Sequence, residues 1–125
     1  MKILHTEASN GWGGQEIRIL NEALWFRDNG HEIILAGPSD AKLKEHAEKN
    51  GFRWISIPFT KKSQFKDYFK LRTLLKKENF DVIATHSSVD SWVGILAGRS
   101  AKVPRIIRYR HVSTPVSNNK RNRWQ

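Results

Sequence analysis

Short apolar runs and longer stretches with helical periodicity alternate along most of the chain. The apolar runs predict strands at residues 2–6, 31–36, 52–57, 81–85 and 105–110. The periodic stretches between them predict helices at residues 15–29, 40–50, 63–79 and 88–99. Gly30 and Gly51 directly follow the first two helical stretches, as C-terminal stops do, and Ser39 or Asp40 is the candidate N-cap of the second.

The apolar positions also predict which side of two helices faces the core. In the first helix these positions are Ile17, Leu20 and Leu24, and in the fourth they are Trp92, Ile95 and Leu96. Strict alternation of near-continuous apolar strands with helices indicates a parallel sheet that helices cover on both faces. We therefore predict a doubly wound, Rossmann-like α/β fold with strand order 3-2-1-4-5. Such folds bind ligands at the carboxyl ends of the strands, here the first and fourth.

The pattern stops at His111, so we assign residues 1–111 to one Rossmann-like domain. Residues 112–125 are polar and basic, and we interpret them as a tail leading towards a further domain that these 125 residues lack. The absence of cysteine excludes disulfides and thiolate metal sites and favours a cytoplasmic protein. The net charge of +10 favours an anionic partner such as nucleic acid, anionic lipid or a phosphorylated substrate.

The glycine-rich segment 7–16 joins the first strand to the first helix. Glycines allow a ligand to approach the backbone, and the free N–H groups of a first helical turn favour a phosphate. A P-loop would need Lys and then Ser or Thr after Gly14, where this chain has Gln15 and Glu16. A dinucleotide fingerprint would need a third glycine near position 16 and an acidic residue closing the second strand. Both of these common interpretations fail.

Two side chains of this turn have both structural and functional interpretations. Glu16 either favours the helix dipole from the first turn or accepts hydrogen bonds from a sugar hydroxyl or a neighbouring loop. Trp12 either packs under the loop or stacks on a sugar ring or base.

Polar residues follow the fourth and fifth strands at the same predicted edge of the sheet. His86 and Ser87 come after the fourth strand, and Arg110 and His111 close the fifth. The two histidines could donate hydrogen bonds to a phosphate or hydroxyl, or exchange a proton. In the simpler interpretation His86 caps the next helix and His111 lies in an exposed turn. No spacing of histidines or carboxylates matches a metal site.

The third predicted helix mixes aromatic residues with lysines, among them Lys61, Lys62, Lys66 and Lys70. Basic residues beside exposed aromatics suit the headgroup region of an anionic membrane. We therefore expect contact with the inner face of the cell membrane, although some of these apolar residues must face the sheet.

Four segments together resemble the N-terminal half of a GT-B glycosyltransferase. They are Gly-Trp-Gly-Gly-Gln-Glu at 11–16, Asn-Gly-His-Glu at 29–32, Asp-Val-Ile-Ala-Thr-His at 81–86 and Pro-Arg-Ile-Ile-Arg-Tyr-Arg-His at 104–111. Their order and spacing are most similar to the retaining, nucleotide-sugar-dependent enzymes of family four. The resemblance extends from Met1 to about Asn119.

The resemblance implies two Rossmann-like domains that face a cleft, with no metal and no cofactor apart from the nucleotide sugar as co-substrate. The N-terminal domain would bind a glycan or lipid-linked acceptor. Gly13 and Gly14 would lie against the donor diphosphate, His111 would contact the transferred sugar as the catalytic candidate, and His86 would lie near the acceptor. Trp12, Glu16, Ser87 and Arg110 complete the expected substrate contacts.

The implied reaction is hexosyl transfer in cell-surface or lipid-linked glycan synthesis. Because the donor domain is missing, we expect these 125 residues alone to transfer no sugar. The main alternative is a basic nucleic-acid-binding α/β module that uses residues 61–77 and the tail from Lys120. No stacking platform or known recognition motif supports it, so we expect no nucleic acid partner. A receiver-like signalling domain would need an aspartate after the third strand, where this chain has Ile57–Pro58–Phe59.

Overall fold

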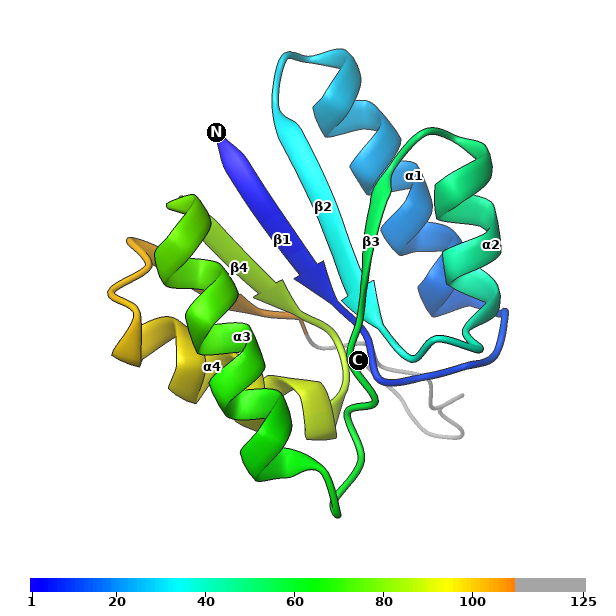
Figure 1. Ribbon diagram of the computed structural model, residues 1–125. Helices are drawn as coiled ribbons and strands as arrows, with labels where there is room; N and C mark the ends of the chain where they lie inside the picture. Colours follow the sequence, from blue (N-terminus) through cyan, green and yellow to red (C-terminus); the bar gives the residue numbers. More distant parts are fainter. Residues whose placement is uncertain (110–125) are drawn as a thin grey trace, which may run out of the picture.

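The computed structural model describes residues 1–109, which form five strands and four helices in strict alternation (Figure 1). In chain order the elements are β1 (Lys2–Thr6), α1 (Gly14–Asp28), β2 (Glu32–Gly37), α2 (Lys42–Lys49), β3 (Arg53–Ser56), α3 (Gln64–Glu78), β4 (Val82–Thr85), α4 (Ser88–Ser100) and β5 (Arg105–Arg108). Every predicted element is present, within a few residues of its predicted bounds. The predicted boundary at residue 111 and the tail 112–125 lie outside the described residues.

The strands form one parallel sheet in the order β3-β2-β1-β4-β5, which confirms the predicted doubly wound topology. β1 is central, and its last residue, Thr6, is in register with Ala36 of β2 and Thr85 of β4. The carboxyl ends of these strands therefore lie along one edge of the sheet. We call it the carboxyl edge, and the opposite one the amino edge.

Helices cover both faces of the sheet (Figure 1). One core cluster joins α1 and α2 to alternate strand residues such as Ile3, Ile33 and Val82. The other joins α3 and α4 to their neighbours Leu4, Ile34 and Ile83. Since successive strand residues point to opposite faces, near-continuous apolar strands are what this two-sided core requires.

The predicted buried face of α4 is wrong. Trp92 and Leu96 are exposed, and the helix is buried instead through Val93, Ala97 and its small residues. A Cβ atom on Gly94 would come within 2.7 Å of the Thr85 side chain, so the helix lies too close to the sheet for larger residues. Ile17 of α1 is likewise exposed, because that helix buries its neighbours Ile19, Leu20 and Ala23.

The predicted cap of α2 is also wrong. The helix begins at Lys42, two residues later than predicted, with Ala41 at the N-cap position. The backbone N–H of Ala41 donates to the carbonyl of Pro38, which places Ser39 and Asp40 in a turn before the helix.

Among residues 1–109, no helix combines the length and the apolar character that crossing a bilayer requires.

Candidate functional site

Buried polar side chains in the described part of the chain gather towards the carboxyl edge. They belong to the ends of β1 and β4 and to the first turns of α1, α3 and α4. The set is His5, Thr6, Glu7, Glu16, Asp67, Thr85, His86, Asp90 and Ser91. A buried polar group is costly unless hydrogen bonds satisfy it. The partners of these residues therefore show how the loops at this edge are held together.

Glu7 ties the turn after β1 to the start of α4. Only 1% of the residue is exposed. Its carboxylate accepts hydrogen bonds from the backbone N–H of Ser9 (3.0 Å), the Gln15 side chain and the Ser87 hydroxyl. Gln15 Nε2 also donates to Ser87 Oγ over 3.1 Å. Two loops about 80 residues apart in sequence are thus held together by one buried carboxylate.

Asp90 fixes the turn between β4 and α4 in a similar way. Its carboxylate accepts hydrogen bonds from Thr6 Oγ1 (2.5 Å) and from the backbone N–H groups of His86 (3.1 Å) and Ser87 (2.9 Å). Burial raises the pKa of Asp90 to about 7, although these hydrogen bonds favour its charged form. These hydrogen bonds hold the turn that carries His86 and Ser87 against β1 and the start of α4.

His5, His86 and Tyr109 form a row on the α1 face of the sheet. His5 Nδ1 lies 3.0 Å from His86 Nε2, and the His86 ring stacks on Tyr109 with ring centroids 4.6 Å apart and an interplanar angle of 12°. Burial lowers the pKa of His5 to about 4, so this histidine is neutral near pH 7. Burial, with Glu22 nearby, raises the pKa of Tyr109. The row fixes the orientation of the His86 ring.

The glycine-rich turn is open at Gly14, the first residue of α1. Gly13 precedes the helix, and its backbone N–H donates to Glu16 Oε1 over 2.8 Å. Gly14 is exposed, and a Cβ atom built there would meet nothing within 4 Å. Positive φ among the described glycines occurs only at Gly30 and Gly51. The glycines of this turn therefore matter for the space they leave at the helix N-terminus, which favours anions.

Trp12 and Glu16 have structural partners inside the domain. The Trp12 ring is half-buried and stacks on His46 of α2, with centroids 3.8 Å apart and an angle of 13° between the rings. Glu16 is buried and accepts the Gly13 N–H, so it closes the first turn of α1. Trp12 thus packs against α2, Glu16 accepts a hydrogen bond from the glycine-rich turn, and both residues lie at that turn.

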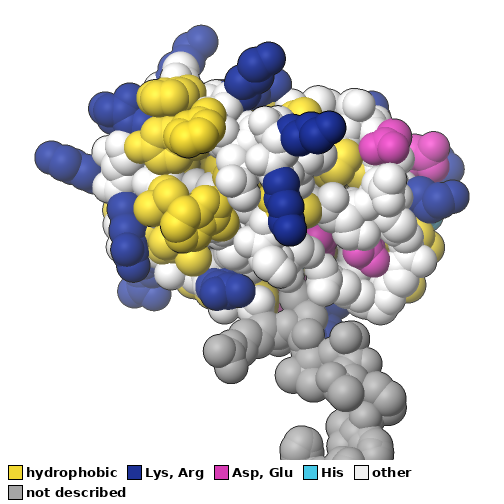
Figure 2. All heavy atoms as spheres, turned by 90° about the horizontal axis from the view of Figure 1, so that it is seen from below, with side chains coloured by type: hydrophobic (Ala, Val, Ile, Leu, Met, Phe, Trp, Pro, Cys, Tyr) yellow, Lys and Arg dark blue, Asp and Glu magenta, His cyan; other side chains and the backbone are white. Residues whose placement is uncertain are grey.

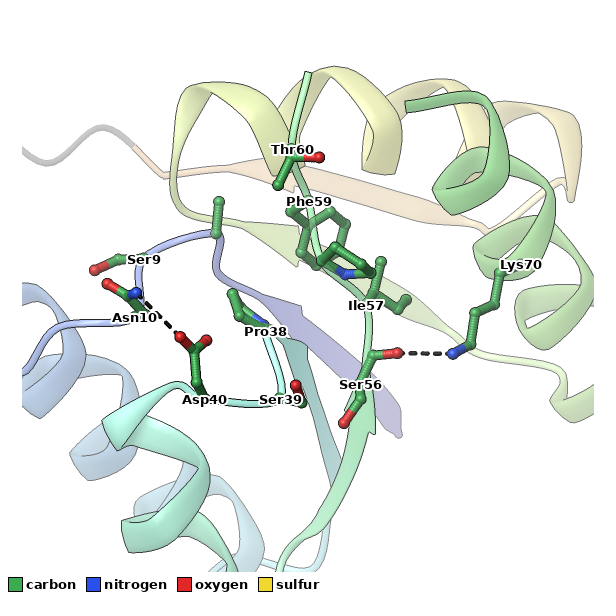
Figure 3. Close-up of a pocket in the computed structure, with 12 residues that line it drawn as sticks. Ser9, Asn10, Pro38, Ser39, Asp40, Ser56, Ile57, Phe59, Thr60 and Lys70 are labelled. Atoms are coloured by element: carbon green, nitrogen blue, oxygen red, sulfur yellow. Dashed lines mark hydrogen bonds between the residues drawn. The ribbon is translucent and has the colours of Figure 1, made fainter. Parts of the chain in front are cut away.

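A pocket of about 640 Å³ lies at the carboxyl ends of β1, β2 and β3, on the side of β1 away from β4 (Figure 3). Small polar residues such as Ser9, Asn10 and Asp40 share its lining with apolar residues such as Pro38 and Ile57. The buried Phe59 also lines it, with φ of 51°, a conformation that a bulky residue rarely adopts. The backbone N–H of Phe59 donates to the buried carboxylate of Asp67 over 2.9 Å, which holds the loop in place.

The predicted site residues thus divide into three groups. The glycine-rich turn, His86 and Ser87 lie together at the carboxyl edge. Lys61, Lys62 and Lys66 are exposed before and within the first turn of α3, and Lys70 Nζ donates to the carbonyl of Ser56 over 2.7 Å. Arg110 and His111 lie outside the described residues.

Sequence reasoning missed the two carboxylates that organise this edge. Ser87 and Asp90 have the Ser-x-x-Asp spacing of a capping box, which could have identified Asp90. For Glu7, the sequence signal was its position directly after a buried strand. Residues 1–109 contain no group of three or more His, Cys, Asp or Glu side chains arranged to hold a metal ion.

Comparisons with known proteins extend this picture. Residues 12–125 match the family model described as Glycosyltransferase Family 4. A comparison with curated proteins gave no match. The fold is similar to that of MurG from Acinetobacter baumannii, with a TM-score of 0.71 and 16% identity over 86% of this chain and 34% of that one.

Two further solved structures are similar. A glycosyltransferase from Rickettsia africae gives a TM-score of 0.77 and 19% identity over 94% of this chain and 31% of that one. HepE from Anabaena, in complex with UDP-glucose, gives a TM-score of 0.72 and 21% identity over 92% of this chain and 30% of that one. The chain thus spans about a third of the length of these proteins. At such identities the likeness concerns the fold alone.

Proposed function

The chain belongs to glycosyltransferase family 4, and from this premise we propose that it is the acceptor-binding domain of a retaining, nucleotide-sugar-dependent hexosyltransferase. The observation that carries the proposal is the open N-terminus of α1 at Gly14, which Glu7, Gln15 and Ser87 hold beside the turn after β4. The similar HepE structure contains UDP-glucose, which supports a nucleotide sugar as the donor.

In this proposal the N-terminus of α1 stabilises the leaving diphosphate. Negative charge accumulates on that group as its bond to the sugar breaks, and the first N–H groups of a helix have no acceptor within the helix. Gly14 leaves room for the phosphates to approach these groups. Gly13 N–H already donates to Glu16, so we assign the phosphate contact chiefly to Gly14 and its successor, Gln15.

We place the acceptor along the same edge, between His86 and the pocket at the carboxyl ends of β1, β2 and β3. Hydroxyl, amide and carboxylate groups on the pocket wall suit a hydroxyl-rich glycan or the glycan head of a lipid-linked acceptor. Ser87 and Trp12 would contribute to substrate binding, as would Arg110, and His111 would contact the transferred sugar. Glu7, Asp90 and His5 act indirectly, by positioning the turns that carry these groups.

Product analysis with the complete gene product tests the proposal. The purified protein is incubated with UDP-, GDP- and dTDP-sugars and with glycan or lipid-linked acceptors, and release of the nucleoside diphosphate is measured. We expect one donor class to be turned over, and the new glycosidic bond to keep the donor's anomeric configuration by NMR. Residues 1–125 alone should show no turnover. Inversion would overturn only the retaining mechanism, whereas no turnover of any donor would overturn the activity.

A further inference from the structure

Helices α3 and α4 share an exposed apolar patch that the rest of residues 1–109 leaves uncovered. Phe65 is 83% exposed and Phe69 is 59% exposed, and both lie on α3. Trp92 (59%) and Leu96 extend the patch onto the adjacent helix α4. A hollow of about 380 Å³ between the two helices is lined by these four residues with Gln64, Tyr68 and Val93. Exposed apolar surfaces of this kind mark contact with a partner or a membrane.

Positive charge surrounds this patch, and hardly any free negative charge offsets it. Helices α3 and α4 carry six basic residues, and Lys61 and Lys62 lie just before α3. Of their three acidic residues, Asp67 and Asp90 are buried and hydrogen-bonded, and Glu78 pairs with Arg53 and Lys2. Helices α1 and α2, on the other face of the sheet, carry five basic and five acidic residues and are balanced.

Seen from the carboxyl edge, the hydrophobic side chains gather on the side of α3 and α4, with Lys and Arg side chains around them (Figure 2). The acidic side chains visible in this view lie on the opposite side. In a parallel sheet each helix begins near the carboxyl end of the strand before it, so Phe65 and Trp92, in the first two turns of α3 and α4, lie towards this edge.

We propose that this α3–α4 patch docks the protein on an anionic phospholipid bilayer. The rings of Phe65, Phe69 and Trp92 enter the interfacial region, and the flanking lysines contact the lipid phosphates. The positive charge around the patch complements an anionic bilayer and so favours the bilayer over a neutral protein surface. Docking through the first turns of α3 and α4 brings the carboxyl edge near the headgroups, where a lipid-linked acceptor would be presented. The docking itself does not depend on sugar transfer.

Vesicle flotation with the purified chain tests the proposal. We expect binding to phosphatidylcholine vesicles that contain phosphatidylglycerol to be at least about tenfold stronger than binding to phosphatidylcholine alone. Combined Phe65→Ser and Phe69→Ser replacement should reduce binding about tenfold or more, as should Trp92→Ala together with Leu96→Ser. These side chains are exposed, so thermal unfolding should show that the variants fold.

Matched controls exist on the opposite face. Trp25 of α1 is 60% exposed, about as much as Trp92. Because it lies outside the patch, Trp25→Ala should leave vesicle binding unchanged. Lys61→Gln, Lys62→Gln and Lys66→Gln together should weaken binding, whereas Lys42→Gln, Lys44→Gln and Lys49→Gln on α2 should weaken it much less. Equal binding to neutral vesicles, or equal losses on both faces, would overturn the proposal. So would a change of oligomeric state in the Phe65 and Phe69 variant, which would assign the patch to a second copy of the chain.

Discussion

The carboxyl edge and the amino edge of the sheet differ in whether their interacting polar groups are buried or near the surface. At the carboxyl edge, carboxylates and hydroxyls are buried and bonded to one another, as Glu7 and Asp90 show. At the amino edge, Glu78 pairs with Arg53 (2.7 Å) and Lys2 (3.1 Å) near the surface, and Arg53 is largely exposed. The Arg53 hydrogen bond lowers the pKa of Glu78 to about 2, with a smaller contribution from Lys2.

This difference separates an ion pair near the surface from a buried network that holds the loops of the proposed site. A surface ion pair forms and breaks at little cost, so it says little about function. A buried polar network costs desolvation energy, which the hydrogen bonds among its members offset. The carboxyl edge maintains such a network at the turns that follow β1 and β4, where a parallel sheet binds ligands. The network therefore holds these loops in one arrangement around the open helix N-terminus at Gly14.

The largest expected effect on stability is at Asp90. Asp90→Ala removes the acceptor for two backbone N–H groups and the Thr6 hydroxyl, and leaves these donors buried. We expect a loss of about 3 kcal/mol in the free energy of unfolding, measured by urea denaturation. A loss below about 1 kcal/mol, as expected for a surface group, would remove the distinction between the two edges.

Lowering the pH should widen the stability gap between the native protein and Asp90→Asn. The pKa of Asp90 rises from 3.8 to about 7 on folding, so between these values the folded protein holds a proton that the unfolded chain releases. The contribution of Asp90 is therefore present at low pH and lost as the pH rises through 7. We expect the gap to be about 2 kcal/mol larger near pH 5 than near pH 8. A gap that stays constant would show that Asp90 is ionised throughout.

The contribution of His5 to stability changes with pH in the opposite direction to that of Asp90. The pH dependence of the native protein alone would therefore mix the two effects, and the Asp90→Asn variant separates them. Its pKa is lowered from 6.5 to about 4, so its contribution is present above pH 6.5 and is lost as the pH falls towards 4. Both proteins contain His5, and its effect cancels in the difference between them.

The smallest expected effect is at the amino edge. Glu78→Gln removes the charge that Arg53 and Lys2 contact, but these cations can return to water. We expect a loss of at most about 1 kcal/mol, which added salt reduces further. Sugar transfer by the complete gene product should be unchanged. A loss as large as that of Asp90→Ala would show that the two edges contribute equally to stability.

The sequence predicted the sheet well, because the alternation of strand and helix is a local signal that the topology rules convert into a strand order. Burial within α4 was predicted wrongly. Its bulky residues suggested a buried Trp92, but the close approach of Gly94 to Thr85 decides which face packs. That approach depends on how α4 packs on the sheet, which no local sequence pattern reveals.

The site was predicted in outline. The glycine-rich turn and the turn at His86 were recognised from their places after strands. The contact of Glu7 with Ser87 and that of Asp90 with Thr6 were not, because the partners lie 80 and 84 positions apart along the chain. Which buried carboxylate meets which hydroxyl becomes visible only once β1 and β4 are paired.

The central claim is that a ligand approaches the backbone at Gly14, and two glycines allow a matched test. Neither Gly14 nor Gly30 has a neighbour within 4 Å of a built Cβ atom, but Gly30 has φ of +90°. Gly30→Ala should therefore lower the free energy of unfolding by about 1 kcal/mol and leave activity intact. Gly14→Leu should leave stability unchanged.

The decisive measurement is kcat/KM for sugar transfer by the complete gene product carrying Gly14→Leu. A side chain there occupies the space assigned to the donor phosphates, so we expect kcat/KM to fall at least about 100-fold while the protein unfolds as before. Full activity with Leu at this position would contradict the account, because no phosphate could then lie against the start of α1.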